Sequence, residues 1–401
     1  MPHNDALTLA TRAQKIEPFH VMELMKRANA LERAGRSIIH MSIGEPDFTA
    51  PPQVLAALDR ALREGRAQYS ASVGVPPLRE AIAHFYKNRY DVDVSPHCVV
   101  VTAGASAALL LTVAALINAG DEVQMPDPSY PCNRHFVQAF DGVPRLISCG
   151  AHERFQLSAE KVASHWNERS RAVLIASPSN PTGTSIEFAE LERIVGAVRA
   201  RGGFTIVDEI YLALSYGAHP RSALELCPNG AGDLIIINSF SKYFNMTGWR
   251  LGWLVAPERL VPVLERLAQN LFICASTPAQ YAALSCFEPE VLALYESRKD
   301  EFQRRRDYLV PALRELGFKI PVPPDGAFYV YADCSGLGMD SSTLADALLD
   351  EAGVALVPGK DFGRNQPERW MRLSYATSME NLTEAVDRMR RFLTQRKVLA
   401  A

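Results

Sequence analysis

One lysine follows an apolar run where a charged side chain is unexpected. Lys242 lies in "NSFSKYFNMTGWRLGW", directly after the apolar "DLIIINS". A lysine ammonium is strongly hydrated and normally stays in water, so a lysine at the end of a buried strand needs a reason. A partly desolvated lysine near other cations has a lowered pKa, and its neutral amine can attack an aldehyde to form a Schiff base. Arg250, further along the same stretch, supplies such a cation.

Three polar side chains lie at or near the ends of apolar runs and could bind the polar groups of an aromatic ring. Asp208, in "IVDEIY", is a carboxylate that should be costly after an apolar run unless it meets a cation or a donor, although a helix cap would also explain it. Tyr211 lies three residues on and could face the same side. Asn180 is fixed between prolines in "SPSNPTG", and its amide can donate to a phenolate oxygen.

A third group of residues suits a phosphate. Gly104, Ala105 and Ser106 stand at an expected helix start, where free N–H groups favour an anion, although a plain N-cap is the alternative. Tyr130, in "DPSYP", offers an aromatic face or is a turn residue. Together these residues could bind four different chemical groups. Asp208 could pair with a protonated ring nitrogen, Tyr211 and Asn180 could bind a phenolate oxygen, and Lys242 could react with an aldehyde. A phosphate could be bound by Ser106, Ser239, Ser241 and Arg250. Pyridoxal phosphate carries all four of these groups.

The elements that would position these residues alternate in type. Continuous Val/Ile/Leu runs separated by helical stretches predict an α/β protein with a mostly parallel sheet covered on both faces. In such sheets ligands bind at the carboxyl ends of the strands, where the polar residues above gather. We expect an N-terminal arm and part of a small domain over 1–48, a large cofactor-binding domain over 49–295, and a small α+β domain over 296–401. The stretch "EPFHVMELMKRANALERAG", which ends at Gly35, predicts an amphipathic helix.

Composition narrows the class of protein. The chain has 401 residues, is 48% hydrophobic and 22% charged, and carries a net charge of -3, which gives no reason to expect a nucleic acid or an anionic membrane as partner. No apolar run reaches the ~18 residues of a membrane span, and the start has no signal-peptide pattern. Seven scattered cysteines without metal spacing predict reduced thiols and no metal site. We therefore expect a cytoplasmic protein.

The sequence resembles the class I, aspartate-aminotransferase-like branch of fold-type I pyridoxal-phosphate enzymes. The resemblance covers nearly the whole chain in order. It is carried by "GEPDF", "YSASVGVPPLREAIA", "VTAGASAAL", "DPSYP", "PSNPTGT", "DEIY", "SFSKYFNMTGWRLGW" and "RLSYA". It implies a large domain with a seven-stranded sheet and a smaller domain built from both termini. It also implies an aminotransferase that moves an amino group from an L-amino acid to 2-oxoglutarate or pyruvate in a ping-pong reaction.

The resemblance also implies a role for each matching residue. Lys242 would form the internal aldimine and move the Cα proton, and Asp208 would keep the ring nitrogen protonated. Arg372 would bind the substrate carboxylate, with Gly44 beside it, and Tyr69 would reach the neighbouring subunit's phosphate in a homodimer. The remaining contacts would be Tyr130 stacked on the ring, Asn180 and Tyr211 on its phenolate oxygen, and Gly104, Ala105, Ser106, Ser239 and Arg250 around the phosphate.

The sequence departs from the family pattern where the substrate side chain would lie. Some relatives have a lysine where this chain has Ser106, and small polar residues where it has Phe19 and His20. His20 and Arg134 are the candidate cations for an acidic side chain, whereas Phe19 favours a neutral or apolar amino donor. Two alternatives keep the fold: a carbon–sulfur β-lyase, and a non-catalytic regulatory module that senses the cofactor. The second is disfavoured by the near-neutral charge and by a match that begins within ~20 residues of Met1, leaving no room for a DNA-binding domain.

Overall fold

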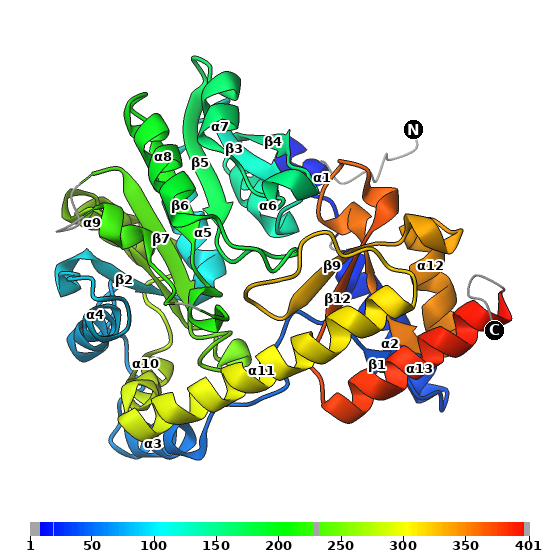
Figure 1. Cartoon of the computed structure of the whole chain (residues 1–401). Coiled ribbons are helices and arrows are strands. Elements are labelled where there is room, and N and C mark those ends of the chain that lie inside the picture. Colours follow the sequence, from blue (N-terminus) through cyan, green and yellow to red (C-terminus); the bar gives the residue numbers. More distant parts are fainter. Residues whose placement is uncertain (1–8, 19, 218, 228–231, 397–401) are drawn as a thin grey trace, which may run out of the picture.

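The computed structural model describes residues 9–18, 20–217, 219–227 and 232–396. A seven-stranded sheet forms its largest layer (Figure 1). The strands lie in the order β2 (Val99–Thr102), β8 (Gly252–Val255), β7 (Leu234–Ser239), β6 (Phe204–Asp208), β5 (Ser170–Ala176), β3 (Glu122–Asp127) and β4 (Val143–Ser148). Only β8 among these seven runs antiparallel to its neighbours, β2 and β7. The predicted α/β class with a mostly parallel, seven-stranded sheet is confirmed.

Helices cover both faces of this sheet because successive residues of each strand point to opposite sides. Along β7, Ile235 and Ile237 belong to one apolar cluster, and Leu234 and Ile236 belong to the other. The first cluster includes residues of α5 (Gly104–Leu116), α6 (Pro131–Ala139) and α9 (Val261–Leu271). The second includes residues of α4 (Pro76–Tyr90), α7 (Ala159–His165) and α8 (Phe188–Arg199). This double cover explains why the strands contain continuous apolar runs.

The two ends of the chain build a smaller α+β body beside the sheet. β12 (Trp370–Ser374) pairs antiparallel with β9 (Tyr329–Asp333) and β11 (Val357–Pro358). β1 (Ile39–His40), from the N-terminal part, pairs with β10 (Val354–Ala355). The helices of this body are α2 (His20–Arg33), α12 (Ser341–Ala347) and α13 (Met379–Gln395). The predicted joining of both termini is therefore observed.

The long helix α11 (Pro289–Glu315) connects the two parts of the molecule (Figure 1, yellow). This helix continues past residue 295, so no break in secondary structure marks the predicted domain limit there. The predicted limits at residues 48 and 295 stay a prediction. The other helices are α1 (Thr11–Lys15), α3 (Pro52–Arg63) and α10 (Thr277–Ala283). All seven cysteines are free thiols. Within the described residues, no helix is long and apolar enough to cross a membrane.

Candidate active site

A cavity of about 390 Å³ lies at the carboxyl ends of β5, β6 and β7, where Ala176, Asp208 and Ser239 line it. Residues of the small body, including Arg372, close its other side. The structure brings most of the predicted site residues into this one cavity, although they come from distant parts of the chain. They are Gly44, Ala105, Ser106, Tyr130, Asn180, Asp208, Tyr211, Ser239, Ser241, Lys242, Arg250 and Arg372.

Lys242 lies just beyond the end of β7, partly buried, and its Nζ donates a hydrogen bond to Gly44 O. Burial lowers the pKa of Lys242 to about 8. This pKa of about 8 already includes the neighbouring charges: the carboxylate of Glu45 opposes the lowering most, the guanidinium groups of Arg372 and Arg250 add to it, and the carboxylate of Asp208 opposes it. A substantial fraction of this amine is therefore neutral near physiological pH, which is the form that reacts with an aldehyde.

Asp208 ends β6 and is 6% exposed. Its Oδ1 accepts a hydrogen bond from Ile210 N at 3.1 Å, but burial still raises the pKa of Asp208 to about 6. A cation placed against this carboxylate would restore the charged form, because an opposite charge offsets the loss of solvation. The protonated nitrogen of a pyridine ring would be such a cation.

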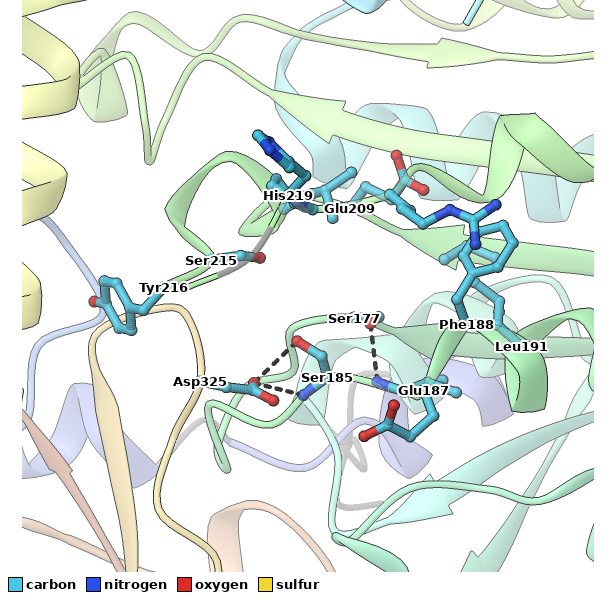
Figure 2. Close-up of a pocket in the computed structure, with 15 residues that line it drawn as sticks. Ser177, Ser185, Glu187, Phe188, Leu191, Glu209, Ser215, Tyr216, His219 and Asp325 are labelled. Atoms are coloured by element: carbon cyan, nitrogen blue, oxygen red, sulfur yellow. Dashed lines mark hydrogen bonds between the residues drawn. The ribbon is translucent and has the colours of Figure 1, made fainter. Parts of the chain in front are cut away.

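The adjacent residue, Glu209, points away from this cavity and lines a separate pocket of about 320 Å³. Figure 2 shows that pocket, with Ser177, Ser185 and Asp325 on another wall. The Glu209 carboxylate accepts hydrogen bonds from Ser222 Oγ and from Ala223 N. Burial raises the pKa of Glu209 to about 8.

One end of the cavity is built for an anion. The N-terminus of α5 meets the guanidinium of Arg250 there, and a Cβ added at Gly104 would lie 2.7 Å from Arg250 Nη2. Gly104 has a φ of +80°, which a side chain would strain. Ser239 Oγ donates to Ser241 Oγ at 2.8 Å, so the two hydroxyls lie side by side. Helix N–H groups, hydroxyls and a guanidinium are the donors that a phosphate prefers.

The opposite end holds a buried arginine. Arg372, 2% exposed, donates through Nη1 to Asn180 Oδ1 at 2.9 Å and through Nη2 to Ser42 O at 2.6 Å. Because its oxygen is taken by Arg372, the Asn180 amide presents its NH₂ group elsewhere. Within the described residues, Arg372 Nε is buried and has no partner, so this guanidinium has capacity for a carboxylate.

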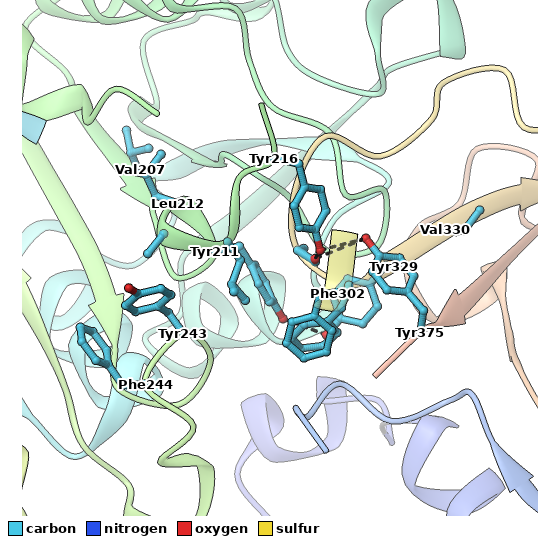
Figure 3. Packing of buried hydrophobic residues seen from close by; sticks show 14 of the residues in the cluster. Val207, Tyr211, Leu212, Tyr216, Tyr243, Phe244, Phe302, Tyr329, Val330 and Tyr375 are labelled. Atoms are coloured by element: carbon cyan, nitrogen blue, oxygen red, sulfur yellow. Dashed lines mark hydrogen bonds between the residues drawn. The ribbon is translucent and has the colours of Figure 1, made fainter. Parts of the chain in front are cut away.

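Tyr329 is a site residue that the sequence did not reveal. Its hydroxyl lies 2.8 Å from that of Tyr211, and Figure 3 shows the two rings meeting in the buried aromatic cluster between the parts. The guanidinium of Arg372 lies 4.5 Å from the centre of the Tyr329 ring. Tyr329 lies in the strand pattern "GAFYVYAD". From this pattern alone, a tyrosine in the core cannot be told from a tyrosine in the site, because the position of the strand in the fold decides which it is.

Three further residues on α2, Val21, Met22 and Met25, were predicted as helix but not as part of the site. All three line the cavity. Asp361 holds the start of this helix: its Oδ1 accepts from His20 N at 3.1 Å and its Oδ2 from Val21 N at 2.9 Å. A carboxylate at a helix N-terminus accepts hydrogen bonds from the free N–H groups and interacts favourably with the helix dipole.

Several predicted residues lie outside this cavity. Tyr69 is 81% exposed and does not line it. Gly104 packs against Arg250 behind it. The candidate cations His20 and Arg134 do not line it either, and Arg134 donates to Asp361 O and pairs with Glu17. Phe19 lies outside the described residues.

The groups in the cavity match one cofactor. An anion cradle lies at one end, a buried carboxylate and a phenolate-binding pair lie beside the reactive lysine, and each agrees with a group of pyridoxal phosphate. The fold and this set of side chains therefore define a pyridoxal-phosphate enzyme of fold type I.

Comparison with known proteins gives the family. Residues 36–389 match the model of "Aminotransferase class I and II". The valine–pyruvate aminotransferase of Mycobacterium tuberculosis is 37% identical over 93% of this chain and 96% of that protein. The aspartate aminotransferase of Thermotoga maritima is 36% identical over 97% of this chain and all of that protein. The crystal structure of an aminotransferase from M. tuberculosis superposes with a TM-score of 0.93 at 36% identity, covering 97% of this chain and 100% of that one.

The chain belongs to the class I and II aminotransferase family. It is a pyridoxal-phosphate-dependent transaminase, as the resemblance implied. This membership supports neither the lyase nor the non-catalytic regulatory module. The relatives carry different substrate names, so family membership alone does not assign the amino donor.

Proposed function

We propose that the enzyme transfers the amino group of an L-amino acid to a 2-oxo acid, 2-oxoglutarate or pyruvate, in two half-reactions with the cofactor attached covalently to Lys242 Nζ. The observation that carries the proposal is Lys242 itself. It is a partly buried lysine with a pKa lowered to about 8, in the same cavity as Arg372, a guanidinium with spare donor capacity. An enzyme that must hold an amino acid by its carboxylate while acting on its Cα needs both groups within one small cavity.

Each residue has a task in this scheme. Arg372 binds the α-carboxylate, and its bonds to Asn180 and Ser42 fix the plane of the guanidinium before the substrate arrives. Once the amino group of the donor has replaced Lys242 on the cofactor, the freed amine of Lys242 would take the Cα proton and later return a proton, and Gly44 O would orient that amine. Bound pyridoxal phosphate supplies an electron sink for the bonding pair that the proton leaves.

The remaining groups hold and tune the cofactor. Asp208 would keep the ring nitrogen of the cofactor protonated. Burial disfavours the lone Asp208 carboxylate, as its raised pKa shows, so a protonated ring nitrogen beside it would stabilise both charges. Asn180 and Tyr211 would donate to the phenolate oxygen, with Tyr329 OH at hydrogen-bond distance from Tyr211 OH. Ser106, Ser239, Ser241 and Arg250 would hold the phosphate, and Tyr130 would stack on the ring.

We also propose that the active unit is a homodimer. Tyr69 is a large aromatic residue that is 81% exposed in the single chain. The proposal places it against the phosphate of the neighbouring subunit, which would bury this ring. A Tyr69→Phe variant should then bind the cofactor more weakly while remaining dimeric by light scattering. Unchanged cofactor affinity would argue against this contact.

The test of the proposed function uses the cofactor-loaded enzyme. Single amino acids are added without an acceptor, and the absorption of the bound cofactor is followed until it changes to that of the pyridoxamine form. Addition of a 2-oxo acid should restore the original absorption and yield a new amino acid. Continuous release of pyruvate and ammonia without an acceptor would indicate a β-lyase instead and overturn the proposal.

A further inference from the structure

The part of the cavity that would receive the substrate side chain is mostly apolar and contains no cation beyond those assigned to the cofactor and the α-carboxylate, among the described residues. We infer that the enzyme takes substrates with uncharged side chains: neutral, apolar amino donors and 2-oxo acids that carry a single carboxylate. This inference rests on the proposed aminotransferase function and narrows it, because it separates pyruvate-like acceptors from 2-oxoglutarate.

A count of charges over the cavity wall is the first step. The charged residues among the described lining residues are Glu45, Asp208, Lys242, Arg250 and Arg372. The cofactor takes Asp208, Lys242 and Arg250, and the α-carboxylate takes Arg372. Glu45 alone is then left over, and it is an anion. The described wall thus offers no second cation for the side-chain carboxylate of aspartate or glutamate.

The surface that remains is apolar. Val21, Met22 and Met25 line the cavity from α2, and Ile43 and Leu109 line it from other segments. Val21 is 4% exposed and packs in an apolar cluster that Met25 also contacts, so this part of the wall is anchored in the small body. Methionine side chains are flexible and adapt to ligands of different shape. We therefore expect tolerance among linear, branched and aromatic side chains.

Neither candidate cation, His20 nor Arg134, lines the cavity. Arg134 donates to Asp361 O at 3.3 Å, lies 3.6 Å from Glu17, and keeps only 12% of its side chain exposed. His20 begins α2, where its backbone N–H is held by Asp361 Oδ1, and its side chain does not line the cavity. The hydrogen bonds to Asp361 also fix the position of α2, so the apolar wall that α2 supplies is held in place by the rest of the fold.

These features set the expected selectivity. A carboxylate enclosed by an apolar wall loses its solvation, and an unpaired buried charge is strongly disfavoured. Leaving one charge of a buried pair unmatched typically costs about 2–5 kcal/mol, which corresponds to at least roughly a thirtyfold loss. Aspartate and glutamate should therefore react at least about thirtyfold more slowly than the best apolar donor, measured as the second-order rate constant of the first half-reaction.

The experiment compares half-reactions of the full-length, cofactor-loaded enzyme. Alanine, valine, leucine, methionine and phenylalanine are compared with aspartate and glutamate by stopped-flow absorbance. Pyruvate and 2-oxoisovalerate are compared with oxaloacetate and 2-oxoglutarate on the aminated form. A pair of variants then tests the effect of a charge in the wall: Met22 is 49% exposed, so Met22→Lys and its neutral control Met22→Gln should both fold. Met22→Lys should increase the rate with glutamate relative to Met22→Gln.

A binding measurement provides a readout that does not depend on turnover. Calorimetry with 2-methylaspartate and 2-methylleucine, which lack the Cα hydrogen, should show tighter binding of 2-methylleucine. Equal or faster reaction with the dicarboxylates, or tighter binding of 2-methylaspartate, would overturn this inference and leave the proposed function intact. If no amino acid changes the absorption of the bound cofactor, the proposed function itself fails, and the two failures are thus distinguished.

Discussion

Asp208 and Glu209 are adjacent carboxylates with opposite surroundings. Both are buried, at 6% and 2% exposed, and burial raises the pKa of Asp208 to about 6 and that of Glu209 to about 8. Asp208 faces the cavity that contains Lys242, whereas Glu209 is held by Ser222 and Ala223 on the other side of the sheet. The alternation of side chains at the end of β6 separates them.

The comparison shows that burial and a raised pKa do not by themselves identify a catalytic acid. Glu209 has the higher pKa, yet its hydrogen-bond partners come from the loop after β6, so it ties that loop to the strand. Asp208 accepts a single bond from the nearby Ile210 N and otherwise faces the ligand space. What a buried carboxylate faces, and what its partners are, indicates its role better than its pKa.

Among the carboxylate substitutions, the largest expected effect comes from exchanging Asp208 or Glu209 for its amide. Asp208→Asn should lower kcat/KM by about a thousandfold, since removal of one preorganised electrostatic contact typically costs 10²–10³. Its fold should be intact by circular dichroism. Glu209→Gln is the matched control, and its kcat/KM at saturating cofactor should stay within about threefold of the wild type. A larger loss in Glu209→Gln than in Asp208→Asn would reverse the assignment.

A third buried carboxylate, Asp361, extends the comparison to the apolar wall. Asp361→Asn removes a charged acceptor from the start of α2 and should raise the KM for the amino donor about tenfold, equivalent to about 1.4 kcal/mol of lost binding. Cofactor affinity should not change. Asp340→Asn alters the corresponding cap of α12, which accepts from Ser342 N and Thr343 N, and is the matched control. Equal effects of the two variants on KM would show that α2 is not a substrate wall.

A smaller effect concerns the pH at which Lys242 becomes reactive. The rate of covalent capture of pyridoxal phosphate by the cofactor-free protein should rise with pH, with a midpoint at about 8, because only the neutral amine reacts. Glu45→Gln should lower this midpoint, since the Glu45 carboxylate raises the pKa of Lys242. Glu187→Gln, in the separate pocket, should leave it unchanged. An unaltered midpoint in Glu45→Gln would remove Glu45 from the electrostatics of the site.

The smallest effect is on the pH dependence of stability. The folded protein keeps the Glu209 proton up to a pKa of about 8, whereas the unfolded chain releases it near 4.5. Folded molecules therefore bind more protons between these values, and stability falls as pH rises across that window. Glu209→Gln should flatten the fall in Tm of the cofactor-free protein between pH 6 and 8, leaving the part due to Asp208 below about pH 6. A slope unchanged by the variant would contradict the buried, protonated state of Glu209.

The sequence predicted the α/β fold, and it singled out most of the residues that the structure brings together in the cavity at the carboxyl ends of the strands. It could do so because Lys242, Asp208 and Asn180 follow apolar runs, and parallel strands bring such positions to one edge. Position along one strand is enough to infer that placement.

The substrate end could not be predicted in the same way. Met22 and Met25 fit an amphipathic helix, and the pattern of that helix does not show which apolar residues face the core and which face a cavity. Tyr329 and Asp361 act through contacts with residues far away in the chain, Tyr211 and the start of α2. Those contacts depend on how the small body packs against the sheet.

The central claim is that Lys242 carries both the cofactor and the proton transfer, and turnover of a Lys242→Ala variant tests it most directly. The variant should keep its fold and lose at least about 10⁴-fold in kcat with the best amino donor, because it lacks both the nucleophile and the base. Lys161→Ala, which removes a partly buried ion pair with Glu153 outside the cavity, should turn over like the wild type. Turnover of Lys242→Ala at the wild-type rate would contradict the account.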